Sequence, residues 1–173
     1  MMSFNYFKRK LFLKKRNILS KQMYTRYKNY TMMPKKDYID YLNFIQDYKY
    51  LEGDIVECGV WRGGAIAGLA NILGERNYYL FDSFEGLPEA KEIDGETAIE
   101  WQKDIEGEGY HDNCAAEISW AKEAMKKSGQ KNNTHFIKGW FEDTLPSNTI
   151  GDIAILRLDG DWYDSTMVCL DYL

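Results

Sequence analysis

The stretch Asp54-Ile-Val-Glu-Cys-Gly-Val-Trp-Arg-Gly-Gly64 decides the expected fold. Residues 54–60 form a short apolar run with a β-branched pair, which predicts a buried strand. The glycine pair that follows predicts a tight turn. The apolar residues 65–73 predict a compact helix, and Gly74, which follows them, predicts its C-terminal cap. A strand, a glycine turn and a helix in this order indicate a parallel sheet with helices on its faces.

The same alternation continues on both sides of this stretch. Upstream, apolar residues at three- and four-residue steps predict a helix between Pro34 and Gly53. Downstream we expect strands at residues 78–82, 135–138 and 152–159, and helices at 113–128 and 165–173. The acidic segment 89–112 has no clear period, so we expect a long loop or a loosely helical lid there. These elements predict one domain of the α/β class.

Length and composition exclude several classes of protein. The chain has 173 residues, a formal net charge of −5 and 45% hydrophobic residues, which suits one domain with a real core and argues against intrinsic disorder. No apolar run approaches the ~20 residues that span a bilayer, and the N-terminus lacks the apolar stretch of a secretory signal. Cys58, Cys114 and Cys169 cannot all pair and match no zinc ligand set. We therefore expect a reduced, cytoplasmic protein.

Charge is distributed unevenly along the chain. Residues 1–36 hold 11 Lys and Arg and no acid, so the formal charge is +11 there and −16 in the rest of the chain, which holds 11 basic residues and all 27 acids. We assign residues 1–30 to a basic N-terminal arm and residues 31–173 to the domain. Apolar residues alternate with the charges of the arm: Phe4, Tyr6, Phe7, Leu11, Phe12, Leu13, Ile18 and Leu19.

Three interpretations of this arm remain open. It could lie on an anionic membrane surface at the inner face of the membrane, as a peripheral contact. It could instead be solvated, fold onto the acidic body of the protein or pack in a homo-oligomer. Nucleic acid is also polyanionic and would attract the same basic residues. No nucleic-acid-binding motif accompanies the charge, so we expect no nucleic-acid partner.

Two strand ends carry residues suited to an organic ligand. In parallel sheets, ligands bind at the carboxyl ends of strands, near the point where the strand order reverses. At the first end, the glycines would let the backbone approach a ligand closely, and Glu57 could accept a hydrogen bond from an amine. The alternative is a plain strand-to-helix turn. At the second end, Asp82 is suited to ribose hydroxyls, and a turn-forming aspartate is the alternative.

A third strand end carries three carboxylates. Asp159, Asp161 and Asp164 fall within six residues after the fourth expected strand. Oxygen ligands of this kind suit Mg²⁺, Mn²⁺ or Ca²⁺. The alternative is that Asp164 or Ser165 caps the following helix. The glycines after the first strand do not follow the G-x-G-x-x-G spacing, which argues against a nicotinamide cofactor.

Together these segments resemble the macrocin O-methyltransferase family, the class I S-adenosylmethionine-dependent enzymes that methylate sugar hydroxyls of macrolides. The resemblance covers most of residues 30–173 and implies a Rossmann-like class I methyltransferase sheet, whereas we do not carry the basic arm over from it. The blocks that carry the resemblance are Gly53-Asp-Ile-Val-Glu-Cys-Gly-Val-Trp-Arg-Gly-Gly64, Phe81-Asp-Ser-Phe-Glu-Gly-Leu-Pro88, Gly139-Trp-Phe-Glu-Asp-Thr-Leu-Pro146 and Leu156-Arg-Leu-Asp-Gly-Asp-Trp-Tyr-Asp-Ser-Thr166.

The C-terminus adds an expectation about completeness. The chain stops inside the apolar segment 167–173, and an open sheet that ended there would leave apolar surface uncovered. In the family, further metal-binding carboxylates lie on a later strand, beyond residue 173. We therefore expect the methyltransferase domain to be truncated at its C-terminus.

The resemblance implies a binding site for S-adenosylmethionine. The residues expected to contact it are Glu57, Gly59, Gly63 and Gly64 for the methionine part, Asp82 and Ser83 for the ribose, Gly139, Trp140 and Phe141 for the adenine, and Thr31 and Met32 in a helical segment that closes over the cofactor. Asp161 would bind Mg²⁺ near the acceptor hydroxyl, with Asp159 in support.

These residues lead to a predicted function. A bound Mg²⁺ would lower the pKa of a sugar hydroxyl, and Asp161 could act as the base. His111 is the second catalytic candidate, with an exposed loop histidine as its alternative. We expect an O-methyltransferase that acts on a sugar hydroxyl of a natural product or surface glycan. The alternatives are a catalytically silent cofactor-binding or interaction protein, and a nucleotide-sugar enzyme that uses NAD.

Overall fold

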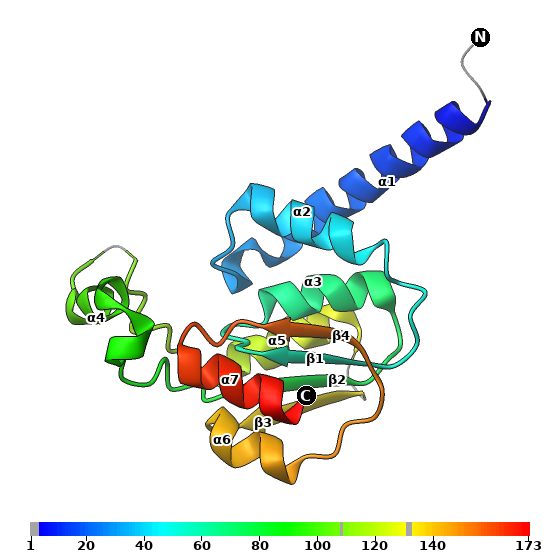
Figure 1. Ribbon diagram of the computed structural model, residues 1–173. Coiled ribbons are helices and arrows are strands. Elements are labelled where there is room, and N and C mark those ends of the chain that lie inside the picture. Colours follow the sequence, from blue (N-terminus) through cyan, green and yellow to red (C-terminus); the bar gives the residue numbers. More distant parts are fainter. Residues whose placement is uncertain (1–3, 108, 131–132) are drawn as a thin grey trace.

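Figure 1 shows a computed structural model that describes residues 4–107, 109–130 and 133–173. Its strands form one parallel sheet in the order β3-β2-β1-β4. The strands are β1 (Asp54–Cys58), β2 (Tyr78–Asp82), β3 (Thr134–Lys138) and β4 (Ile153–Leu158). The strand order reverses between β1 and β4, so a ligand site is expected at the carboxyl ends of these two strands. The predicted α/β class and parallel sheet are confirmed.

Helices cover both faces of this sheet (Figure 1). In the described part of the chain they are α1 (Phe4–Tyr27), α2 (Lys35–Ile45), α3 (Gly64–Leu73), α4 (Glu96–Lys103), α5 (Ile118–Ser128), α6 (Phe141–Thr144) and α7 (Tyr163–Tyr172), with 3-10 turns η1 (Lys28–Tyr30), η2 (Glu92–Asp94) and η3 (Leu145–Ser147). The helices α1, α2, α3 and α5 pack together on one face, and α6 and α7 pack on the other. The short α4 lies apart from both layers, in the lid segment that follows β2.

Burial on both faces explains why the strands read as continuous apolar runs. Successive side chains of a strand point to opposite faces. Ile55 is fully buried in the core beneath α2 and α3, whereas its neighbour Val56 is fully buried on the other face, against Leu145 and Cys169. Alternation of polar and apolar residues is therefore absent from β1, as the sequence suggested.

Tyr38 fixes α2 against α3. Its side chain is fully buried, and its Oη donates a hydrogen bond to the carbonyl oxygen of Gly64 over 2.8 Å. The ring reaches this position because Gly68 has no side chain: a Cβ at residue 68 would overlap Tyr38 Oη. This contact places the segment before α2 directly over the turn between β1 and α3.

One segment differs from the sequence prediction. We expected a helix from Asn113, but α5 begins only at Ile118. The cause is a turn, residues 111–114, in which four successive non-glycine residues have φ between 48° and 60°. Such a left-handed backbone cannot continue into a right-handed helix. The segment 89–112, expected as a loop or loosely helical lid, contains the two-turn helix α4.

The basic arm forms the 24-residue helix α1. Residues 4–27 contain no glycine or proline and are rich in Lys, Arg and Leu, which favours a helix. Its first part projects from the body (Figure 1), but Met23, Tyr27 and Tyr30 are buried in the same core as α2 and α3. The core thus includes residues that we assigned to the arm. No helix in the described ranges is long and apolar enough to cross a membrane.

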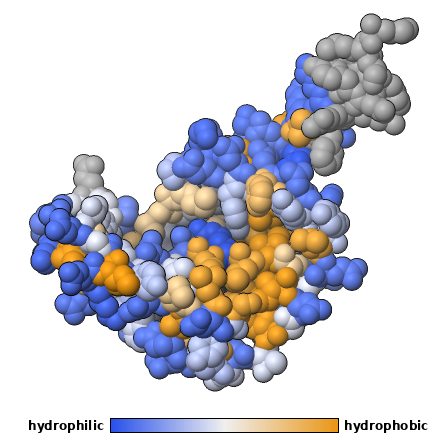
Figure 2. Space-filling view, in the orientation of Figure 1, coloured by the Kyte–Doolittle hydropathy of each residue, from blue (hydrophilic) through white to orange (hydrophobic). Residues whose placement is uncertain are grey.

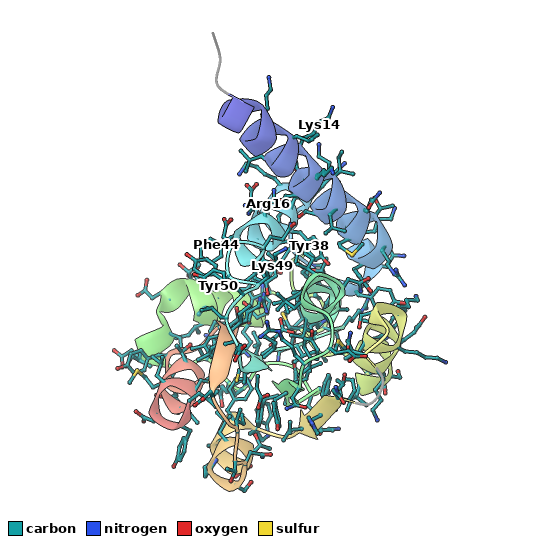
Figure 3. The ribbon with its side chains drawn as sticks, turned by 90° about the vertical axis from the view of Figure 1, so that its right-hand side faces the viewer. Lys14, Arg16, Tyr38, Phe44, Lys49 and Tyr50 are labelled. Atoms are coloured by element: carbon teal, nitrogen blue, oxygen red, sulfur yellow. The ribbon has the colours of Figure 1, made fainter. Side chains whose placement is uncertain are left out.

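Polar contacts also join α1 to α2. Arg16 Nη1 lies 2.5 Å from Asp47 Oδ1, and Ser20 Oγ donates a hydrogen bond to Asn43 Oδ1 over 2.9 Å. Figure 3 shows Arg16 directed toward α2, whereas Lys14 points away from the body. The expected apolar side chains Phe4, Tyr6, Phe7 and Phe12 lie outside the side chains that the structure describes.

Hydrophobic residues also gather on the surface over β4 and α7 (Figure 2). Met167 is 37% exposed and Leu170 is 57% exposed, and the residues of β4 are only partly buried. No described strand pairs with the outer edge of β4. This edge therefore presents unpaired backbone groups beside apolar side chains.

The packing of α2 on α3 gives a stability prediction. Gly68→Ala should lower the free energy of unfolding by about 1–2 kcal/mol, because the new methyl group displaces Tyr38 and this outweighs the higher helix propensity of alanine. Urea denaturation measures the change. Gly109→Ala is the matched control, because a Cβ there would meet only Trp101 Nε1, at 3.7 Å. Equal stability of both variants would contradict the packing argument.

Candidate functional site

A cleft opens at the carboxyl ends of the strands, where the strand order reverses. It brings together residues that are up to 133 positions apart in the chain (residues 32 to 165). Seven of the expected cofactor contacts line it, and both expected metal ligands do so too. These are Met32, Gly59, Asp82, Ser83, Gly139, Trp140 and Phe141, together with Asp159 and Asp161.

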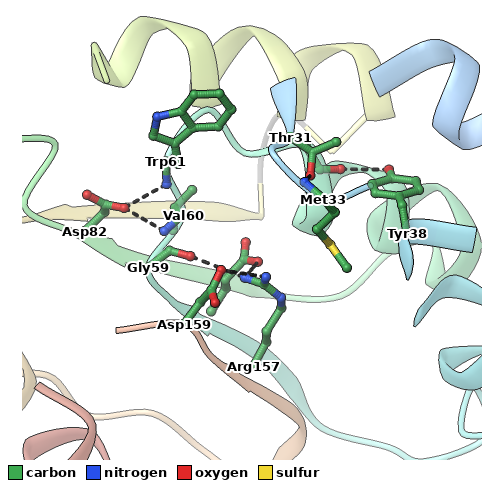
Figure 4. Close-up of polar contacts among 11 residues, drawn as sticks. Thr31, Met33, Tyr38, Gly59, Val60, Trp61, Asp82, Arg157 and Asp159 are labelled. Atoms are coloured by element: carbon green, nitrogen blue, oxygen red, sulfur yellow. Dashed lines mark hydrogen bonds and ion pairs between the residues drawn. The ribbon is translucent and has the colours of Figure 1, made fainter. Parts of the chain in front are cut away.

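The carboxylate of Asp82 ties the end of β2 to the turn after β1 (Figure 4). Its Oδ2 accepts hydrogen bonds from the backbone N–H groups of Val60 (2.6 Å) and Trp61 (2.8 Å), and its Oδ1 accepts one from Phe84 (2.6 Å). Burial raises the pKa of Asp82, and the three amide donors oppose that rise. A carboxylate has about four acceptor positions, so one remains for a ligand.

Gly59 allows β1 and β4 to approach each other at the floor of the cleft. Its φ is +86°, and a Cβ would overlap the carbonyl oxygen of Asp159. Hydrogen bonds hold this arrangement: Gly59 N donates to Phe81 O over 2.9 Å, and Asp159 N donates to Cys58 O over 2.8 Å. Any side chain at residue 59 would push the two strand ends apart.

The other two glycines of this turn do not line the cleft. Gly63 precedes α3 with φ +78°, and a Cβ there would lie 3.0 Å from Ala121 Cα. At Gly64 a Cβ would overlap the carbonyl oxygen of Tyr30. Close packing of α5 and η1 on the turn therefore accounts for both glycines. Their contact with a cofactor stays a prediction.

Glu57 lies in a buried network, and it is not a lining residue of the cleft. Its side chain is 1% exposed, and its Oε1 accepts a hydrogen bond from Arg157 Nη1 over 2.8 Å. Arg157 Nη2 lies 2.7 Å from Asp159 Oδ2 (Figure 4). Burial raises the pKa of Glu57 to about 7, against the opposing charge of Arg157. Oε2 is buried without a hydrogen-bond partner, and its contact with a ligand amine stays a prediction.

The acidic residues after β4 fit the chemistry of a base better than a complete metal site. Burial, and then the charge of Asp159, raise the pKa of Asp161 to about 6. Within the described ranges, no group of three or more His, Cys, Asp or Glu is placed to hold a metal ion. Asp159 is also engaged by Arg157. The two carboxylates together form at most a partial ligand set.

Two expected site residues line a neighbouring cavity, not the cleft. His111 is exposed and lies in the left-handed turn with φ +48°. Thr31 also lines that cavity, and its Oγ1 accepts a hydrogen bond from Met33 N over 3.1 Å (Figure 4). The adjacent Met32 lines both spaces. The segment before α2 is therefore at the junction between them.

Residues that sequence reasoning missed also line the cleft. Pro88 lines the cleft, and its carbonyl oxygen accepts hydrogen bonds from Gln102 Nε2 (2.8 Å) and Trp162 Nε1 (2.9 Å). These bonds attach the lid to the loop between β4 and α7. Trp61 and Cys114 also line the cleft. Trp61 lies within the glycine stretch quoted above. The contact between Pro88 and Trp162, 74 residues apart, leaves no local signal in the sequence.

Comparison with known proteins places this geometry in a family. The family model described as macrocin-O-methyltransferase (TylF) matches residues 16–173. Over 127 residues the chain is 34% identical to the 8-demethyl-8-(2,3-dimethoxy-alpha-L-rhamnosyl)-tetracenomycin-C 4'-O-methyltransferase of Streptomyces olivaceus. This alignment covers 70% of this chain and 47% of the relative. Over 124 residues it is 36% identical to the demethyldecarbamoylnovobiocin O-methyltransferase of Streptomyces niveus, covering 66% and 44%. The chain spans about half the length of the curated relatives it matches.

Solved structures agree with this assignment. The O-methyltransferase NovP superposes with a TM-score of 0.63 and 25% identity, covering 95% of this chain and 78% of that chain. The calicheamicin methyltransferase CalS11 has a TM-score of 0.52 and 17% identity, covering 88% and 70%, and supports the fold alone.

The burial of Glu57 gives a pH prediction. Its folded pKa, about 7, lies above the ordinary value of 4.5. Its contribution to stability is therefore fully present below about pH 4.5 and is lost as the pH rises through 7, by as much as about 3 kcal/mol. Urea denaturation between pH 4.5 and 8 should show this decline in the wild type and a flatter profile in Glu57→Gln.

Glu52→Gln is the control for this series, because Glu52 is exposed. Its profile should follow the wild type. A Glu57→Gln profile that is parallel to the wild-type profile would refute the assigned titration.

Proposed function

The chain belongs to the macrocin O-methyltransferase family, and from this premise we propose that it acts in S-adenosylmethionine-dependent methyl transfer to a sugar hydroxyl of a natural product or surface glycan. The names of two relatives support the substrate class, since one names a rhamnosyl-tetracenomycin and the other demethyldecarbamoylnovobiocin. The observation that carries the proposal is the cleft at the strand switch point, with Asp82 at its wall.

The residues of the cleft fit the three parts of the cofactor. Asp82 has one acceptor position left for a ribose hydroxyl, with Ser83 beside it. Trp140 and Phe141 offer aromatic surface for the adenine. We keep Glu57, whose buried Oε2 has no partner and which lies outside the cleft lining, as a proposed partner of the amino group at the methionine end. When bound, S-adenosylmethionine supplies a methyl group that is already activated by a sulfonium centre.

The task of the protein is then alignment, water exclusion and proton removal. The lid packs against the loop between β4 and α7: the Trp101 ring lies 6.1 Å from the Trp162 ring and 5.6 Å from the Tyr110 ring, measured between centroids. Asp161, with its pKa raised to about 6, is our proposed base for the acceptor hydroxyl. His111 is our second candidate, for an acceptor that extends into the neighbouring cavity.

We also propose that Mg²⁺ assists, held by Asp159 and Asp161. Mg²⁺ keeps several waters and is usually bound through one or two carboxylates, which two acidic side chains at the cleft wall can provide. At this position the ion would lower the pKa of the acceptor hydroxyl.

The basic arm leads us to propose a peripheral contact with an anionic membrane surface at the inner, cytoplasmic face. Lys10, Lys14 and Lys15 are exposed on the projecting part of α1, with Leu11 and Leu13 exposed between them. All three cysteines are free thiols, which suits the reducing cytoplasm. Packing of α1 in a homo-oligomer is the alternative use of this surface.

The first prediction from the proposed function concerns cofactor binding. Isothermal titration with S-adenosylhomocysteine should show binding to the wild type and at least about tenfold weaker binding to Asp82→Asn, because a charged acceptor is lost from a charge-assisted hydrogen bond. Glu89→Gln, an exposed change in the lid segment, should bind as the wild type does. Circular dichroism checks that both variants are folded.

Methyl transfer is measured in the same preparation with labelled S-adenosylmethionine and a panel of glycosylated natural products and glycans. Transfer should be lost with EDTA and restored by Mg²⁺. A wild type that does not bind S-adenosylhomocysteine would refute the proposal. Binding without transfer to any acceptor would favour a silent cofactor-binding protein, and tight binding of NAD would favour a nucleotide-sugar enzyme.

The second prediction concerns the arm. Replacement of Lys10, Lys14 and Lys15 by Gln should weaken binding to vesicles that contain phosphatidylserine by roughly 1 kcal/mol per lysine, measured by co-sedimentation. The control replaces three exposed lysines of the body, Lys103, Lys122 and Lys126. Equal loss in both variants, or no vesicle binding by the wild type, would reject a membrane role for α1.

A further inference from the structure

Asp161, the base in the proposed function, has a strained backbone. Its φ is +55°, and Trp162 N donates a hydrogen bond to Gly160 O over 2.6 Å, which closes a three-residue turn around it. A turn of this kind with a positive φ at its central residue is the rare, strained form of the γ-turn. A non-glycine residue keeps such a conformation only where the surrounding structure holds it in place.

Residues 88–94, where the lid begins, hold the residues that follow Asp161. Trp162 Nε1 donates a hydrogen bond to Pro88 O over 2.9 Å. The next residue, Tyr163, donates its backbone N–H to Asp94 Oδ1 over 2.7 Å. The two pairs are 74 and 69 positions apart in the chain. The strained turn is therefore fixed by a distant segment and not by its own sequence alone.

The contact of Asp94 with Tyr163 is a helix cap. Tyr163 is the first residue of α7, and the first N–H groups of a helix have no partner within it. The residue before the helix, Trp162, makes no side-chain cap hydrogen bond. Asp94 supplies the missing acceptor from another part of the chain, and its negative charge suits the positive end of the helix dipole.

Asp94 is itself held within the lid. Its Oδ2 accepts a hydrogen bond from Lys91 N over 2.7 Å in the turn η2, so one carboxylate binds the lid with one oxygen and α7 with the other. An ion pair of Lys91 Nζ with Asp164 Oδ2, at 2.6 Å, lies beside it. Both of those side chains are more than half exposed, and exposed ion pairs contribute little. Loss of Asp94 should therefore release the turn more than loss of Lys91.

Both partners of this contact adjoin the wall of the cleft. The lining residues next to the lid are Gly86, Leu87 and Pro88, and those around the strained turn are Gly160, Asp161 and Ser165. The lid helix α4 fixes the first group, because Gln102 accepts a hydrogen bond from Ala90 N and donates one to Pro88 O, each over 2.8 Å. A shift of the lid would thus also move the segment that carries Asp161.

We propose that Asp94 is a positioning residue for the base: by capping α7 it holds Asp161 in its left-handed conformation at the wall of the cleft. The inference rests on the proposed function, because it takes Asp161 as the base of a methyl transfer. Asp94 is not among the lining residues of the cleft. Its loss should therefore slow the reaction without weakening the binding of the cofactor.

Amide hydrogen exchange tests the contact without an acceptor. It is followed by mass spectrometry on the full chain, free and with S-adenosylhomocysteine. Peptides that cover residues 159–164 should exchange at least tenfold faster in Asp94→Ala than in the wild type, whereas β3 should be unchanged. Asp94→Asn keeps an amide oxygen for Tyr163 N, so it should lie between the two. Glu92→Gln, an exposed change in the same turn η2, should match the wild type.

Methyl transfer separates a positioning role from a structural one. With an acceptor that the panel above identifies, Asp94→Ala should lower kcat at least tenfold and change the KM for S-adenosylmethionine less than twofold, and Asp94→Asn should recover part of the loss. Asp161→Asn should also lower kcat. The double variant should be no slower than Asp161→Asn alone, because the two residues act on one step.

Two results overturn this inference. One is equal exchange of residues 159–164 in Asp94→Ala and the wild type, which decides the matter even if no acceptor in the panel is methylated. The other is that the rate losses of Asp94→Ala and Asp161→Asn multiply, which indicates that Asp94 acts independently of the base. In both cases wild-type binding of S-adenosylhomocysteine leaves the proposed function intact, whereas its absence refutes the function itself.

Discussion

The hydrogen bonds from the Val60 and Trp61 amides to the carboxylate of Asp82 join the two strand ends that form the cleft. They hold the turn after β1 against the end of β2 and give Asp82 its orientation. Because Gly59 lets β4 approach the same point, three strand ends converge on a small space. Ion pairs of Arg157 with the buried Glu57 and with the exposed Asp159 also join β1 to the end of β4, so the cleft and the stability of the fold depend on the same residues.

Much of the cleft was predictable from the sequence, because parallel strands end at one edge of a sheet. Asp82, Gly59 and the segment 139–141 each follow an apolar run, so their convergence required only the strand assignments. The family blocks gave the same residues. The structure adds a distinction: Gly63 and Gly64 fit the packing of neighbouring elements, a demand that looks the same in sequence as a ligand-binding turn.

Other features had no local signal. The left-handed turn at residues 111–114 contains no glycine, so the sequence did not predict that α5 begins at Ile118. The stacking of Arg62 depends on Trp120, which lies 58 residues away in the chain. The partition of α1 into a projecting part and a buried part depends on the position of α2 and α3, whereas the sequence showed only its charge.

A crystal structure of the protein with bound S-adenosylhomocysteine tests the central claim most directly. Our account predicts that a ribose hydroxyl lies within hydrogen-bonding distance of Asp82 while the Val60 and Trp61 amides keep their bonds to the same carboxylate. It also predicts the adenine beside Trp140 and Phe141. A ribose bound elsewhere in the cleft, with Asp82 contacting only backbone amides, would contradict the account.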